Sequence, residues 1–144
     1  MRRLLLALTV LLLTGCTGLV RSGDVYESKA GASAKAAGSA VQTARLAVDA
    51  ATGGKAFGRT TAQLLAEAAE EAGSVQGTFD AIQPPDAGSD RLRAELDDLL
   101  GQAVASLDAL RIAARRGDEA ALAADARPLG ALSDKLDAFA EAHA

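Results

Sequence analysis

The sequence contains few of the residues on which most protein chemistry depends. Its 144 residues include one cysteine, one histidine, one methionine and no tryptophan, and aromatic residues make up 3%. A single cysteine excludes a disulfide framework and a thiolate metal site. With one histidine, zinc, di-iron and haem sites lack their ligands, and a serine nucleophile lacks its base. We expect that histidine, His143, to be a frayed terminal residue.

The acidic residues do not compose a recognisable active site either. Glu67, Glu70, Glu71, Asp97 and Asp98 are interpreted as solvated helix faces, because none has the spacing of a calcium loop. No buried carboxylate pair of the kind that glycosidases use stands out, and the aromatic residues are too few to line a sugar-binding cleft. We therefore predict that the protein is not an enzyme and binds no metal or other cofactor.

The charge balance restricts the partners. The formal net charge is −4 at pH 7, with 15 basic and 19 acidic residues. An acidic chain of this kind is a poor ligand for nucleic acid and for anionic lipid surfaces. The predicted partners are therefore another protein or a small molecule, and the oligomeric state stays open.

The N-terminus has the layout of an export signal. Arg2 and Arg3 resist translocation, and residues 4–13 are almost entirely apolar. That run is about half of the roughly 20 residues that a membrane-spanning helix needs, so it fits the apolar region of a signal peptide.

The next residues, Leu13-Thr14-Gly15-Cys16, resemble the lipobox of bacterial lipoproteins at every position. The resemblance implies cleavage between Gly15 and Cys16 and a covalent diacylglycerol and acyl lipid such as palmitate on Cys16. The protein would then be anchored on the extracytoplasmic face of the cell membrane, or on an outer membrane if the cell has two. The alternative is an ordinary secretory signal followed by a chance cysteine. The predicted organisation is a signal peptide over 1–15, a lipidated tether over 16–23 and one domain over 24–144.

Four amphipathic segments predict four helices in that domain, over about 24–51, 60–83, 89–116 and 118–142. The first has an apolar face spaced by three and four residues, consisting of Ala34, Ala37, Val41, Ala44, Val48 and Ala51. Alanine contributes little apolar area, and Gly31 and Gly38 each weaken a helix by about 1 kcal/mol. We expect this helix to be the loosest.

The second and third segments have larger apolar residues. Thr60 or Thr61 is the predicted cap of the second, which ends before Pro84-Pro85, and Ser89 or Asp90 is the predicted cap of the third. The second face consists of Leu64, Ala68, Ala72, Val75, Phe79 and Ile82. The third consists of Leu92, Leu96, Leu99, Ala103, Leu107, Leu110 and Ala114, widened by Leu100 and Val104.

The last segment follows a very short connection, in which Gly117 ends the third helix and Asp118 caps the fourth. Pro128 lies inside the fourth segment, yet the helical spacing continues across it, so we predict one kinked helix. Its face consists of Leu122, Asp125, Leu129, Leu132, Leu136 and Phe139. Since no segment alternates as a strand does, the predicted fold is all-α, an antiparallel up-down four-helix bundle.

One polar feature falls on this apolar face. A kink at Pro128 would free the carbonyl group of Ala124, and with Asp125 and Arg127 beside it a polar notch could bind a small ligand or a partner. The alternative is that Asp125 turns to the edge and pairs with one of three arginines, Arg45, Arg93 or Arg111.

Two functions remain. The first is a non-catalytic, membrane-anchored interaction or scaffold module that binds another envelope protein, which an exposed apolar patch along the first helix would support. The alternative is a small-ligand-binding or sensory bundle, which a pocket of several hundred Å³ with converging polar groups would support.

Overall fold

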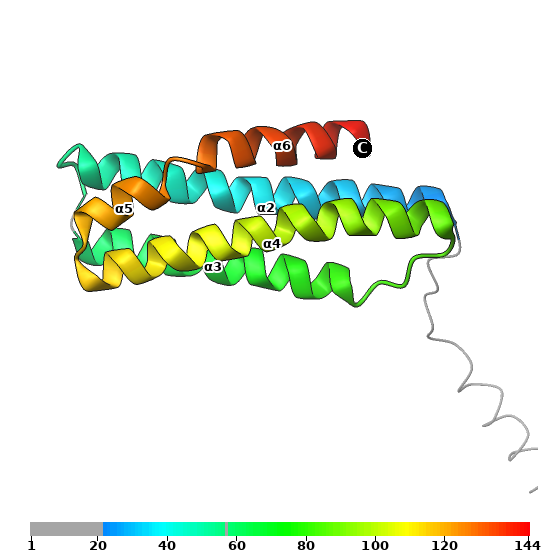
Figure 1. Ribbon diagram of the computed structural model, residues 1–144, viewed down its shortest axis with the longest axis horizontal. Helices are drawn as coiled ribbons and strands as arrows, with labels where there is room; N and C mark the ends of the chain where they lie inside the picture. The colour runs from blue at the N-terminus through cyan, green and yellow to red at the C-terminus, as the bar shows by residue number, and fades with distance from the viewer. Residues whose placement is uncertain (1–21, 57) are drawn as a thin grey trace, which may run out of the picture.

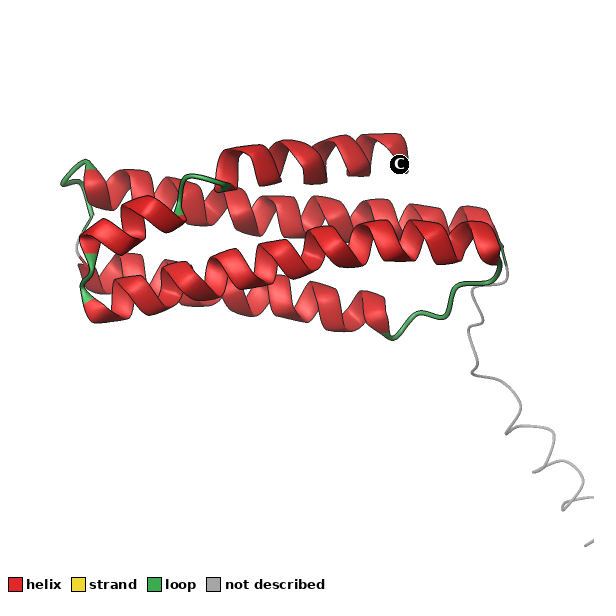
Figure 2. Cartoon of the chain, in the orientation of Figure 1, coloured by secondary structure: helices red, strands yellow, loops and turns green. Residues whose placement is uncertain are grey.

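The computed structural model describes residues 22–56 and 58–144, and this part of the chain contains helices and no strand (Figures 1 and 2). The helices are α2 (Gly23–Thr52), α3 (Gly58–Asp80), α4 (Ala87–Arg116), α5 (Glu119–Asp125) and α6 (Leu129–Ala142). They pack as an antiparallel four-helix bundle in which α5 and α6 together make the fourth helix, so the predicted fold class is confirmed. The predictions for the leader, Gly15 and Cys16 lie outside the described residues.

The bundle has a near end and a far end, at which different elements meet. At the near end α2 begins, and residues 81–86 lead from α3 into α4 (Figure 1). At the far end the chain passes from α2 into α3, and a turn at Gly117 and Asp118 leads from α4 into α5.

Helix α2, like α4, contacts all four other described helices, whereas α3 and α6 do not touch. The prediction that this helix would be the loosest is therefore wrong. Most of its alanines are buried, and two of its glycines allow the C-terminal segment to pack closely against it. A Cβ on Gly31 would overlap the carbonyl group of His143, and a Cβ on Gly38 would lie 3.2 Å from Asp137 Oδ1. Small residues reduce the apolar area of α2 but let its backbone approach its neighbours closely.

Two of the predicted caps are wrong and two are confirmed. Helix α4 is capped by Asp86, whose Oδ1 accepts a hydrogen bond from Ser89 N at 2.8 Å, because the extended backbone of Asp86 turns the chain into the helix one turn earlier. Gly117, at φ 66°, ends α4, and Asp118 accepts from Ala121 N at 2.9 Å.

The predicted cap of α3 also changes place. The helix begins at Gly58, so Thr60 and Thr61 lie in its first turn and Thr61 is buried. Leu65 replaces Leu64 as a fully buried residue of α3, while Ala68, Ala72 and Phe79 are buried as predicted.

The prediction of one kinked helix across Pro128 is wrong, because the helix breaks into α5 and α6 there. Proline has no N–H to donate to Ala124, and the chain tightens into a turn in which Arg127 N donates to Ala124 O and Leu129 N donates to Ala126 O. The apolar spacing is kept on both sides of the break, so Leu122 and Leu129 still reach the core.

Candidate functional site

A cavity with a volume of about 640 Å³ lies at the far end. Its walls come from the end of α2, the start of α3, the end of α4 and the first turns of α5, and most of its lining residues are alanine and glycine. Because methyl groups fill little volume, four helix ends converge here without closing the interior.

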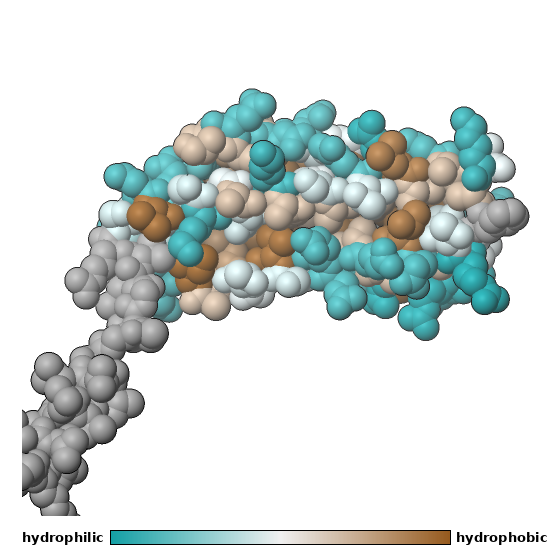
Figure 3. All heavy atoms as spheres, turned by 180° about the vertical axis from the view of Figure 1, so that it is seen from behind, coloured by the Kyte–Doolittle hydropathy of each residue, from teal (hydrophilic) through white to brown (hydrophobic). Residues whose placement is uncertain are grey.

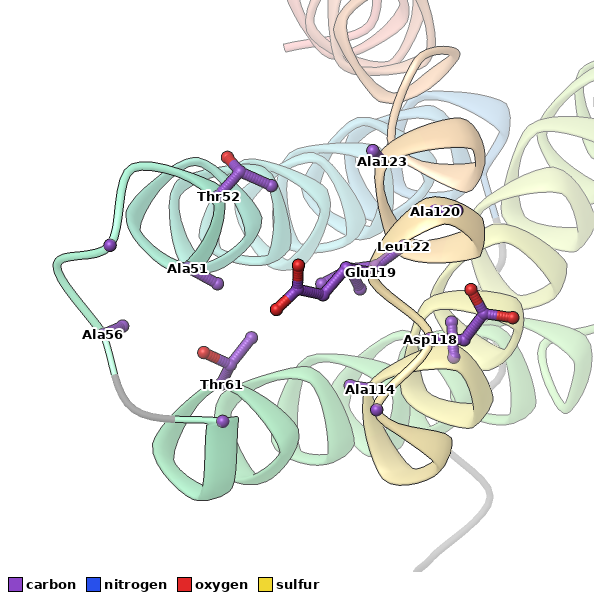
Figure 4. Close-up of a pocket in the computed structure, with 14 residues that line it drawn as sticks. Ala51, Thr52, Ala56, Thr61, Ala114, Asp118, Glu119, Ala120, Leu122 and Ala123 are labelled. Carbon is purple, nitrogen blue, oxygen red and sulfur yellow. The ribbon is translucent and has the colours of Figure 1, made fainter.

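Two acidic residues at the start of α5 have different roles at this cavity (Figure 4). Asp118 is occupied as the helix cap. The Glu119 side chain extends into the space between α2 at Ala51 and α3 at Thr61, while Leu122 lies behind it. A carboxylate above an alanine wall suits a molecule with an apolar body and a cationic or hydrogen-bond-donating group.

A second polar cluster lies at the near end and was not predicted. Arg93 donates through Nη2 to the carbonyl oxygen of Asp80, the last residue of α3, at 2.8 Å, and through Nη1 to that of Ile82, just beyond the helix, at 3.0 Å. Its Nε also lies 3.5 Å from Asp97 Oδ2. Arg93 therefore joins the end of α3 to α4, as a cation placed at the negative end of a helix dipole.

Tyr26 and Asp97 complete this cluster. The Tyr26 ring is fully buried and packs at 5.6 Å against Phe79, and neither Tyr26 Oη nor Asp97 Oδ1 has a hydrogen-bond partner among the described residues. Burial raises the pKa of Tyr26, and burial followed by the charge of Asp80 raises the pKa of Asp97 against the effect of Arg93. The interpretation of Asp97 as part of a solvated face holds only in part, because its side chain is 38% exposed while its Oδ1 atom is enclosed.

A sequence signal for Tyr26 existed. Extending the alanine face of the first helix backwards by its own spacing, from Ala34 through Ala30, arrives at Tyr26. The roles of Arg93 and Asp97 had no such signal, because they depend on where α3 ends relative to α4.

His143 is placed by contacts, so the prediction of a frayed residue is wrong. Its Nδ1 lies 2.8 Å from Glu27 Oε1, and its ring lies 4.5 Å from the ring of Phe139. The end of the chain is thereby held against the first turns of α2.

The residues of the predicted notch do not converge. Pro128 borders a shallow pocket between α4 and α6, whereas Asp125 and Arg127 do not line it. The carbonyl group of Ala124 accepts from Arg127 N. Among the described residues the Asp125 carboxylate forms no ion pair: Arg93 contacts Asp97, Arg111 contacts Asp108, and Arg45 is not within ion-pair distance of it.

The described residues contain no group of three or more His, Cys, Asp and Glu side chains arranged to hold a metal ion. None of the described helices combines the length and apolar character that crossing a membrane requires. No protein-family model, curated protein or solved structure matches the chain.

Proposed function

We propose that the protein is a membrane-anchored bacterial lipoprotein whose bundle is a non-catalytic interaction module of the cell envelope. The lipobox-like sequence supports the anchor. Residues 17–22 separate Cys16 from α2, and an extended chain of that length spans only about 25 Å. The near end of the bundle would then face the membrane, and the far end with its cavity would face away.

One observation carries the interaction proposal: a continuous line of uncharged residues runs along the exposed side of α2, although the helix also exposes charged residues beside that line, among them Lys29, Lys35 and Arg45. This outer stripe of α2 consists of Val25, Ser28, Ala32, Ala36, Ser39, Thr43, Leu46 and Ala50. Leu46 is 65% exposed and Val25 47% exposed. A helix whose outer face serves only for solubility normally carries charges there.

Two of the three hydroxyl groups of the stripe add little polarity. Ser39 Oγ donates to Lys35 O at 3.1 Å and Thr43 Oγ1 donates to Ser39 O at 2.9 Å, so both satisfy their donors within the helix. A groove of about 470 Å³ lies beside the stripe, between α2 and α3. Seen from behind, a pale and light-brown band runs along the middle of the molecule between hydrophilic margins (Figure 3).

The far-end cavity favours a second candidate, a module that binds a small molecule. Its about 640 Å³ would accommodate a compact amphiphile, with its apolar part on the alanine wall and a cationic group near Glu119. The cavity exists because the alanine side chains that line it are too small to fill it.

Native mass spectrometry of the full-length protein, extracted from its own membranes in mild detergent, tests both candidates. We expect a mass that lacks residues 1–15 and includes lipid on Cys16, together with a protein subunit. A bound small molecule instead would favour the second candidate. A bare, unlipidated monomer would contradict the proposed anchor and the interaction module together.

A further inference from the structure

We infer that the partner of the outer stripe of α2 is a second copy of this chain, packed parallel to the first about a two-fold axis along α2. The inference rests on the proposed interaction function and its membrane anchor. In such a dimer the stripes face each other, and each residue of the stripe meets its own counterpart.

Packing at the stripe requires close approach of the two helices. The positions at its middle are Ala32, Ala36, Ser39 and Thr43, whose side chains are small. Larger side chains are at its two ends, where Val25 and Leu46 are exposed. The spacing by three and four residues keeps these positions in one line, as in the contact line of paired helices.

The anchor selects the parallel orientation. Helix α2 has 30 residues and is therefore about 45 Å long. In an antiparallel pair one Cys16 would start at the far end and its tether, with a reach of about 25 Å, could not return to the same membrane. A parallel pair places both tethers at the membrane-facing end.

Charge selects the same orientation. The groove beside the stripe is bordered on the α3 side by Glu67 and Glu71, and Lys35 follows the opposite edge of the stripe, toward α6. Neither Lys35 nor Glu71 forms an ion pair among the described residues. A parallel two-fold axis brings the Lys35 edge of each copy over the acidic edge of the other. An antiparallel pair would instead bring the two acidic edges together, which is unfavourable.

Cysteine cross-linking of the full-length protein in its own membranes tests the orientation. The single variants Ala32→Cys and Leu46→Cys lie at different heights on the stripe, and each should form disulfide-linked homodimers under mild oxidation. Ala105→Cys is the matched control. Ala105 is exposed on α4, away from the outer stripe of α2, so this variant should remain monomeric. An antiparallel pair centred on Ser39 would instead link Ala32→Cys to Leu46→Cys in a mixture, and neither variant to itself.

A charge exchange tests the contact between Lys35 and Glu71. Lys35→Glu should lower the yield of the Leu46→Cys homodimer by roughly fivefold, the factor that about 1 kcal/mol gives. Adding Glu71→Lys should restore the yield. Circular dichroism of each variant shows that the bundle is retained, so a loss of cross-linking reports the interface.

The outcomes separate this inference from the proposed function. Homodimers at both positions and rescue by the exchange support it. Cross-links only to a different protein would overturn the second copy while the interaction function stands. No cross-link at either position would overturn the inference, and the mass of the Cys16 peptide reports the anchor independently.

Discussion

The two ends of the bundle are packed with side chains of different size. At the near end, Tyr26 packs on Phe79, Phe139 packs on His143, and Arg93 binds the end of α3. At the far end, alanine and glycine meet around a cavity of about 640 Å³, with the Glu119 side chain in it. Every aromatic residue in the described part of the chain lies toward the near end.

The difference shows what side-chain volume does in a bundle of constant helix geometry. Aromatic rings fill the near end, and the two orphaned oxygen atoms there, Tyr26 Oη and Asp97 Oδ1, are enclosed. Methyl groups do not fill the far end, so a cavity stays open there. Stability should therefore come mainly from the near end.

Truncating an aromatic residue should have the largest effect. Phe79→Ala should lower the free energy of unfolding by about 3–5 kcal/mol, because a fully buried ring is lost and Tyr26 loses its neighbour. Leu122→Ala at the far end should cost about 2 kcal/mol, since Leu122 already borders the cavity on one side. Urea unfolding followed by circular dichroism measures both, and equal losses would contradict the contrast between the ends.

A methyl group at the contact between α2 and α6 should have the next largest effect. Gly31→Ala would place Cβ against the carbonyl group of His143, which must move, at a cost of about 1–3 kcal/mol. Gly77→Ala is the matched control, because its Cβ meets open space, and it should gain about 0.5–1 kcal/mol. Thermal unfolding compares the two, and a gain in both would show that α6 is not held at Gly31.

The smallest effect should appear as a pH dependence at the near end. The pKa of Asp97 is raised in the folded protein, so the folded state binds this proton more tightly than the unfolded state. The contribution of Asp97 to the free energy of unfolding should rise as pH falls from neutral through the raised pKa, and it should be complete below the unfolded value. The capping residue Asp86 has a lowered pKa and contributes with the opposite sign, since its bond to Ser89 N is lost at low pH.

Comparing Asp97→Asn with the wild type by urea unfolding at a series of pH values isolates this effect. The variant should lack the gain in mild acid, whereas Asp98→Asn, the exposed neighbour on α4, should retain it. A gain of the same size in Asp97→Asn would show that another group is responsible.

The fold was largely predictable, because the sequence patterns that indicate its helices and their ends are local in the chain. The faces of α2 and α4, the end of α4 at Gly117 and the cap at Asp118 follow from residues within one or two helical turns. The break at Pro128 was local too, but the regular spacing from Leu122 to Phe139 concealed it: a turn and a kinked helix can keep the same apolar phase.

The candidate sites were much less predictable. Glu119 has no sequence signal, since its place in the cavity depends on the ends of four helices. Asp97 resembles its exposed neighbour Asp98 in sequence, and only the fold brings it beside Arg93 with one carboxylate oxygen enclosed. The uncharged stripe on α2 was present in the sequence, but only the packing shows that it lies on the uncovered side of the helix.

By itself, the sequence determined which segments become helices, which side of each is apolar, and that the chain folds as an antiparallel bundle. Those properties depend on backbone propensity and on the 3.6-residue period. Tertiary structure alone decided that the alanine-rich helix contacts every other described helix, that His143 contacts Glu27 and that the far end is open. These depend on which side chains meet across long separations in the chain, where size and shape, not periodicity, determine what fits.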